Sequence, residues 1–194
     1  MNINSISKTF AKKLVDGGAD PKLEKIYAYG IEGILTTGII LLILFAAGLL
    51  LGKLSNMIVF IVAWLPLRIL VGGIHANTHL MCTIISVVLG IVSVLLTKQL
   101  NAIPFYAIAI TAAVCYIIFF TLSPVVHKKH PISNAHRRKM RVAARVYAVI
   151  ECGCIVAFAY FKFEAMAPAL MACALTAVME VMGWLSKDAI REYA

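Results

Sequence analysis

The stretch that decides the fold is IEGILTTGIILLILFAAGLLL, residues 31–51, which carries a single charged side chain, Glu32. An α-helix rises about 1.5 Å per residue, so about 20 apolar residues cross a hydrocarbon core about 30 Å thick. Residues 31–51 are long and apolar enough for this. The stretch therefore predicts a membrane-spanning helix.

Five more apolar runs follow it, with rough limits 54–71, 80–97, 103–123, 143–161 and 165–185. The chain of 194 residues is 62% hydrophobic, well above the apolar share of ordinary soluble domains. All but one of the gaps between runs are short. We therefore expect an all-α polytopic membrane protein of one domain, 1–194, with about six transmembrane helices.

The second run, 54–71, is short for a span and holds Pro66 near its end, with Gly72 and Gly73 directly after it. Proline removes a backbone donor and clashes with the preceding turn, and glycine also weakens a helix. The sequence thus predicts a broken or re-entrant segment at this point.

The first 30 residues are polar and lack an early apolar segment, so we expect no cleavable signal peptide. Within them, Ile6, Phe10 and Leu14 are spaced by four, between lysines at 8, 12 and 13. This pattern predicts an N-terminal amphipathic helix. We expect it to lie in the membrane interface, and a solvated helix is the alternative.

Basic residues are divided unevenly between the two sides of the predicted spans. If the N-terminus is cytoplasmic, 15 of the 18 basic residues fall on that side. The other side keeps Lys53, Lys98 and Lys162, one in each connection. Cytoplasmic connections of membrane proteins are enriched in lysine and arginine. We therefore predict cytoplasmic N- and C-termini.

The longest hydrophilic connection is SPVVHKKHPISNAHRRKMR, residues 123–141, within a basic cytoplasmic loop that we place at 124–142. It contains six lysines and arginines, three histidines and no acid. One interpretation is a topogenic loop that touches anionic membrane lipids. The other is a surface that docks an acidic partner through Lys128, Lys129, Arg137, Arg138 and Lys139. The histidines have no cysteine or carboxylate nearby, so we expect no metal site.

The most reactive side chains lie in RILVGGIHANTHLMC, residues 68–82, between two apolar runs. A nucleophilic cysteine needs a base or a lowered pKa. Asn77 and Thr78 are good N-cap residues, so Cys82 would lie near the positive end of a helix dipole. The nearby bases are His75 and His79. An inert cysteine with polar anchoring histidines is the alternative.

Helix geometry distinguishes the two histidines. In one continuous helix His75 lies about 10.5 Å along the axis from Cys82, too far for a hydrogen bond, whereas His79 lies about 4.5 Å away. His75 can be the base only if the helix is interrupted between the two residues. Spacing alone therefore favours His79 slightly.

Arg68 and three acids within the spans, Glu32, Glu151 and Glu180, are further candidates. Arg68 either supports the site and binds a carboxylate, or is an anchor whose charged end reaches the interface. Charged groups inside a span usually face a partner. Ion pairs with Arg68 or Arg145 are one interpretation of the acids, and orientation of a catalytic histidine is the other. The remaining cysteines are interpreted as small buried apolar residues: Cys115, Cys152, Cys154 and Cys173.

The pattern Arg68-x3-Gly72-Gly73-x-His75-Ala76-x5-Cys82 resembles the signature of the accessory gene regulator B family, bacterial membrane endopeptidases that process quorum-sensing pro-peptides. Chain length, the basic N-terminal segment, the number of spans and the basic loop also resemble this family. The resemblance implies that His75 and Cys82 are the catalytic pair. It gives His79 no role, and it implies a helix break before Cys82.

The resemblance also implies the substrate and location. The substrate would be a short pro-peptide with an amphipathic N-terminal helix and an acidic C-terminal tail. Cys82 would form an acyl-thioester, and an internal thiol or hydroxyl of the peptide would close a thiolactone or lactone ring. The site would lie at the cytoplasmic face of the bacterial cell membrane. We expect no cofactor and no nucleic acid, assign Gly72 and Gly73 a conformational role, and leave a homodimer open.

Two other functions remain open from sequence. A small transporter would use the histidines and buried glutamates as a proton or metal path, and its thiol would be dispensable. A non-enzymatic membrane scaffold would bind acidic peptides through residues 123–141.

Overall fold

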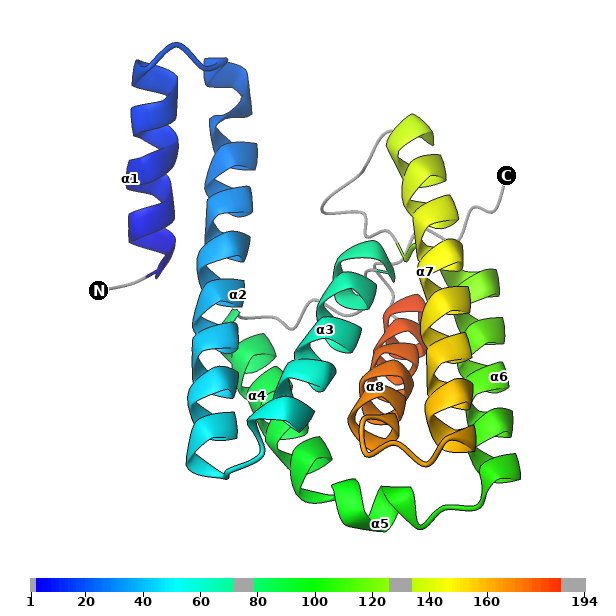
Figure 1. Cartoon of the computed structure of the whole chain (residues 1–194). Coiled ribbons are helices and arrows are strands. Elements are labelled where there is room, and N and C mark those ends of the chain that lie inside the picture. Colours follow the sequence, from blue (N-terminus) through cyan, green and yellow to red (C-terminus); the bar gives the residue numbers. More distant parts are fainter. Residues whose placement is uncertain (1–2, 72–78, 126–133, 186–194) are drawn as a thin grey trace.

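The computed structural model describes residues 3–71, 79–125 and 134–185, and every regular element among them is helical (Figure 1). The elements, in chain order, are α1 (Ile3–Asp16), the 3₁₀-helix η1 (Pro21–Leu23), α2 (Glu24–Leu50), α3 (Leu54–Val71), α4 (His79–Leu95), α5 (Thr97–Asn101), α6 (Phe105–Leu122), α7 (Asn134–Tyr160) and α8 (Met166–Leu185).

Five of these helices are long and apolar enough to cross a membrane: α2 with η1, α3, α6, α8 and the part of α7 from residue 137. The run predicted at 80–97 is α4, whose 17 residues are about 25 Å long. Its apolar part, Thr83–Leu95, is shorter than the others. The all-α polytopic fold is confirmed, with five candidate spans and the shorter apolar helix α4 in place of the sixth predicted run.

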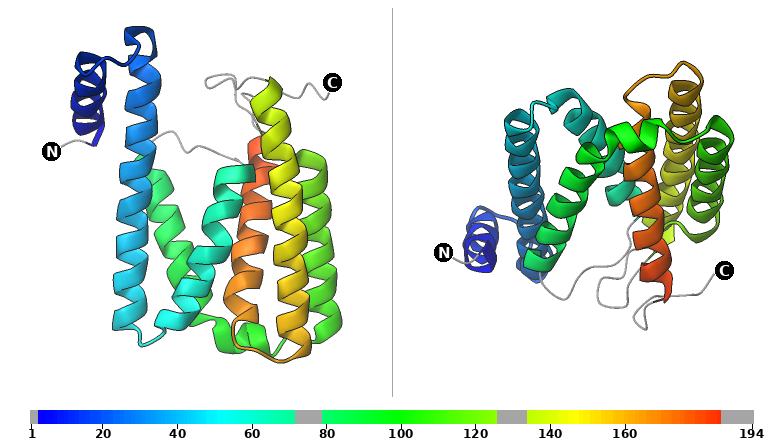
Figure 2. Two further views of the ribbon diagram at one scale, coloured as in Figure 1. Left: turned by 45° about the horizontal axis from the view of Figure 1, so that its top comes forward. Right: turned by 90° about the horizontal axis from the view of Figure 1, so that it is seen from below.

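Helix α8 lies at the centre of the bundle, and α3, α6 and α7 pack around it (Figure 2). Its buried face is built from small side chains, which allow neighbouring helices to approach closely. They are Ala167, Ala169, Ala172, Cys173 and Ala177. The core therefore depends on close contact between helix backbones as well as on large side chains.

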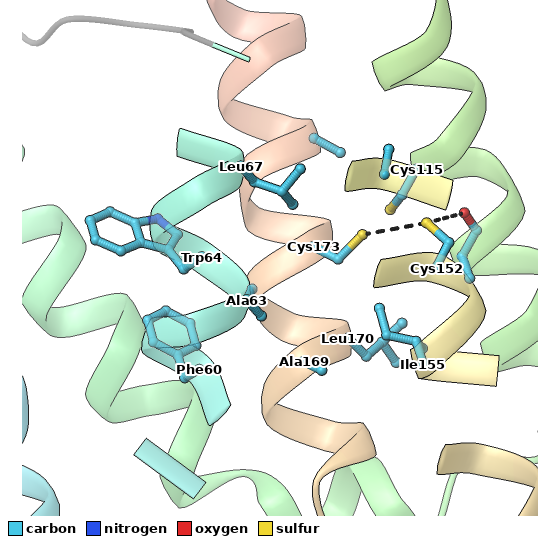
Figure 3. Close-up of a cluster of buried hydrophobic side chains, with 14 of the residues drawn as sticks. Phe60, Ala63, Trp64, Leu67, Cys115, Cys152, Ile155, Ala169, Leu170 and Cys173 are labelled. Atoms are coloured by element: carbon cyan, nitrogen blue, oxygen red, sulfur yellow. Dashed lines mark hydrogen bonds between the residues drawn. The ribbon is translucent and has the colours of Figure 1, made fainter. Parts of the chain in front are cut away.

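Three of the cysteines lie in this core, as predicted (Figure 3). The Cys152 thiol is 3.4 Å from the backbone oxygen of Ala112 and 4.0 Å from the sulfur of Cys173. Cys115 is buried on α6, whereas Cys154 is exposed on α7. The prediction of small buried residues is thus confirmed for three of the four.

Helices α2 and α4 extend the bundle on the side of α3 (Figure 2). At Gly48 of α2, an added Cβ would lie 2.9 Å from the Cβ of Met57 on α3. At Gly90 of α4, it would lie 2.6 Å from the nearest side-chain atom of Leu44 on α2. Glycine at these two positions is therefore what lets the three helices pack this closely.

The predicted N-terminal helix is present as α1, which runs alongside the first half of α2 (Figures 1 and 2). Its small residues Ser7 and Ala11 are buried, while Phe10 and Leu14 are about half exposed. Helix α1 therefore follows the axis of α2. A helix lying flat in the membrane interface would cross that axis instead.

The predicted break does not occur at Pro66, because α3 continues through it to Val71, whereas Gly72 and Gly73 lie outside the described residues. Proline lacks the N–H that would bond to the carbonyl oxygen of Val62, four residues earlier. The Tyr147 hydroxyl of α7 donates to this oxygen instead, at 2.9 Å. A neighbouring helix thus satisfies the carbonyl that Pro66 leaves free, which keeps α3 intact.

The two ends of the bundle differ in charge. Lys53, Lys98 and Lys162 lie in the α2–α3 connection, in α5 and in the α7–α8 connection, which share one end (Figure 1). We call this the lysine end. Helices α3, α6 and α8 finish at the other end, where α4 and α7 begin, and we call it the basic end. Arg68 in the last turn of α3 and Arg137 and Arg138 near the start of α7 lie at the basic end. The described residues therefore follow the predicted separation of charge, and its direction across the membrane stays a prediction.

Candidate active site at the basic end

Helix α4 begins at His79, directly after the predicted N-cap residues Asn77 and Thr78. His79 and Cys82 are its first and fourth residues, so their backbones share one helical turn, about 4.5 Å apart along the axis. This confirms that Cys82 lies at the start of a helix. The predicted site residues His75, Gly72 and Gly73 lie outside the described residues, as do the side chains of 79–82.

Arg68 lies in the last turn of α3, which ends at Val71. One terminal nitrogen of its guanidinium is 3.6 Å from the sulfur of Met179 on α8. The side chain therefore points toward α8, along the surface on which α3 and α8 pack.

Glu180 of α8 is completely buried and does not form the ion pair with Arg68 that the sequence suggested. Its Oε1 accepts a hydrogen bond from the Ser123 hydroxyl at 2.7 Å. Its Oε2 has no partner among the described residues. The prediction was wrong because a carboxylate in a helix core binds the nearest donor in space. That donor comes from the end of α6, a segment distant in sequence.

Ser123, Pro124 and Val125 form a short buried segment directly after α6. The backbone N–H of Val125 donates to the carbonyl oxygen of Val71 at 3.0 Å. The last carbonyls of a helix lack partners within the helix, so this bond caps the end of α3. Sequence analysis did not single out Ser123. Its one signal was a Ser-Pro pair at the end of a predicted span.

Glu151 of α7 is buried, and neither carboxylate oxygen has a partner among the described residues. The predicted ion pair with Arg145 is therefore wrong as well. Arg145 donates from two guanidinium nitrogens to the Phe120 carbonyl oxygen, at 3.2 and 2.9 Å, and lies 4.0 Å over the Phe120 ring. It binds the end of α6, and Glu151 lies about 9 Å further along α7.

The basic loop residues divide into two groups. Lys128 and Lys129 lie outside the described residues, whereas Arg137, Arg138 and Lys139 lie in the first two turns of α7. Arg138 and Lys139 line an open groove of about 840 Å³ that reaches Leu70 of α3. Its remaining lining is mostly apolar: Ala135, Val142, Ala143, Val146, Tyr147 and Ile150. Two predicted docking residues thus lie near the end of α3 that precedes Gly72.

The family described as accessory gene regulator B matches residues 3–183, nearly the whole chain. No curated protein and no solved structure matches it.

Proposed function

The chain belongs to the accessory gene regulator B family, and we propose that it is a membrane-embedded cysteine endopeptidase acting on a quorum-sensing pro-peptide. Membership links the chain to accessory gene regulation and pro-peptide processing. The observation that carries the finer proposal is the position of Cys82 in the first turn of α4. There the helix dipole favours a thiolate, and the motif places a histidine on either side of the helix start.

In the proposed first half-reaction, the Cys82 thiol gives its proton to His75. The thiolate then attacks the backbone carbonyl carbon at the junction of the signal sequence and the C-terminal tail. A carbon–sulfur bond forms, the carbon–nitrogen bond breaks, and the histidine returns its proton to the leaving amine. The products are the released tail and an acyl-thioester on Cys82.

In the second half-reaction, an internal thiol or hydroxyl of the bound peptide attacks the thioester carbon. Its proton passes through His75 to the departing Cys82 sulfur, so the enzyme returns to its starting state. The nucleophile gains from its high effective concentration within the same molecule. A site at the membrane edge also excludes water, which would otherwise hydrolyse the thioester.

The remaining predicted residues have supporting roles in this proposal. Arg68 binds a substrate carboxylate or supports the end of α3, and Gly72 and Gly73 give the following segment its conformation. The basic side chains dock the acidic tail. Their proposed members are Lys128, Lys129, Arg137, Arg138 and Lys139.

The deciding experiment replaces Cys82 by alanine and measures pro-peptide cleavage in membranes. We expect cleavage to fall to background while the amount of membrane-inserted protein stays normal. The matched control is Cys154→Ala, at an exposed cysteine of α7, which should retain activity. Cleavage by the Cys82→Ala protein would exclude a cysteine peptidase and favour the transporter interpretation.

A second pair of variants identifies the base. His75→Ala should fall near background, because an unperturbed thiol pKa of about 8.5 leaves little thiolate at neutral pH. His79→Ala should keep measurable cleavage, although His79 shares the first turn of α4 with Cys82. The opposite result, an inactive His79→Ala and an active His75→Ala, would assign the base to His79.

A further inference from the structure

Two functional segments of the chain start side by side at the basic end. The segment that carries His75 and Cys82 begins after Val71, and the segment that carries Lys128 and Lys129 begins after Val125. The backbones of Val71 and Val125 are joined by the 3.0 Å hydrogen bond that caps α3. The last described residues before the two segments are therefore in direct backbone contact.

This junction is fixed to the centre of the bundle through Ser123. Ser123 is 3% exposed and lies two residues before Val125, and its hydroxyl donates to the fully buried Glu180 at 2.7 Å. The distance of 2.7 Å is the usual length of an O–H···O hydrogen bond in proteins. The bond therefore holds the end of α6 against α8 at the depth where α3 ends.

A glutamate buried at this position needs a physical explanation. Its second oxygen is buried and has no partner within the described residues, which is costly inside a helix bundle. An apolar residue would pack against α6 without that cost, so packing alone does not explain it. A directional bond to Ser123 does, because only an acceptor sets the position of the hydroxyl and of the backbone that follows.

We propose that Ser123 and Glu180 form a positioning clamp: their bond and the bond from Val125 to Val71 hold the end of α3, from which the chain leads to Cys82, in the place that catalysis needs. Neither residue touches the substrate, so both are positioning residues. This inference rests on the proposed function, since it assumes that Cys82 reacts.

The test measures alkylation of Cys82 by iodoacetamide in the full chain in lipid nanodiscs, followed by peptide mass spectrometry. The variants are Ser123→Ala, Glu180→Leu and Glu180→Gln. The alkylation rate at neutral pH should fall on the order of tenfold in Ser123→Ala and Glu180→Leu, because a displaced end of α3 moves the proposed base away from Cys82 and less of the thiol is then ionised. The pH of half-maximal rate should rise in both. Glu180→Gln should stay within about twofold of the wild type, because an amide oxygen still accepts the bond.

The matched control is Thr176→Val. Thr176 is also fully buried on α8, one turn earlier, but its hydroxyl donates to Ala172 of its own helix at 2.8 Å. This variant should keep the wild-type alkylation rate. In cleavage assays the clamp variants should lower kcat and leave KM almost unchanged, because the docking residues are intact.

The double variant Ser123→Ala/Glu180→Leu should be no slower than either single variant, because both remove one bond. If Glu180→Leu fails to fold, Ser123→Ala carries the test alone, since it removes one oxygen atom. A wild-type alkylation profile in Ser123→Ala, or additive losses in the double variant, would overturn the clamp. Should Cys82→Ala keep full cleavage, the proposed function fails instead, a result that these alkylation rates do not affect.

Discussion

The two ends of the bundle differ in the connections between their helices. At the lysine end, two connections are short turns that use backbone with positive φ, at Gly52 (63°) and Lys162 (56°), and the third contains the short helix α5. At the basic end, seven residues separate α3 from α4 and eleven separate α6 from α7. The candidate catalytic and docking residues all lie in or beside these two longer connections.

The lysine end also carries a cluster of exposed aromatic side chains. Phe105, Tyr160, Phe161 and Phe163 pack against one another at the lysine end, with ring centroids 5.2 to 6.4 Å apart. All four are more than 40% exposed. Exposed aromatic rings collect at membrane–water interfaces, so this cluster is suited to anchoring that end. The lysine end is therefore suited to positioning the bundle, whereas the proposed chemistry lies at the basic end.

The largest expected effect tests which end faces the cytoplasm. Single cysteines at Lys53, Lys98 and Lys162, introduced into a chain without other reactive thiols, should react with an impermeant maleimide added to intact cells. Cysteines at Lys128 and Lys187 should not react until the membrane is opened. Labelling at residue 128 from outside would reverse the topology and place the candidate site on the wrong side of the membrane.

A smaller, several-fold effect is expected from the charges of the basic end. Arg138→Gln combined with Lys139→Gln should raise KM for the pro-peptide more than it lowers kcat, because these side chains contribute to binding without taking part in the reaction. Added salt should weaken wild-type binding in the same way, since exposed charges are screened. The measurement is steady-state cleavage in vesicles at two salt concentrations.

The lysine end supplies the control for this experiment. Lys98→Gln combined with Lys162→Gln removes the same charge from the other end and should leave KM unchanged. If both double variants have equal KM values, the basic loop is only topogenic and the contrast between the ends does not extend to substrate binding.

The sequence predicted the ends of the spans better than their beginnings. Predicted limits of 51, 71 and 161 match the ends of α2, α3 and α7 within one residue. Helix α2, however, begins at residue 24 and α7 at residue 134, seven and nine residues earlier than predicted. An apolar window detects only the part of a helix inside the membrane, whereas a polar extension without proline or another strong breaker simply continues it.

Contacts between helices, including those near the candidate site, were less predictable from the sequence. Pro66 showed that the Val62 carbonyl loses its helical partner, but only the fold shows that Tyr147 replaces it. Likewise, hydropathy marked Glu180 as unusual without indicating Ser123, 57 residues away. Short-range patterns reveal which groups need a partner. The partner itself depends on which helices pack together, and small residues spread along α8 determine that.

The smallest expected effect on activity is at Gly48, near the lysine end of α2. In Gly48→Ala the new methyl group would lie 2.9 Å from the Cβ of Met57, an atom that cannot move without shifting α3. Overpacking of this kind costs about 1–3 kcal/mol, so the variant should unfold at a lower temperature in detergent micelles. Gly38→Ala is the matched control on α2, because its methyl group meets open space and alanine favours a helix by up to about 1 kcal/mol over glycine. Cleavage per folded molecule should be unchanged in both proteins. A fall in kcat for Gly48→Ala at temperatures where it is fully folded would show that packing at the lysine end reaches the catalytic segment, and the division between the two ends would then have to be abandoned.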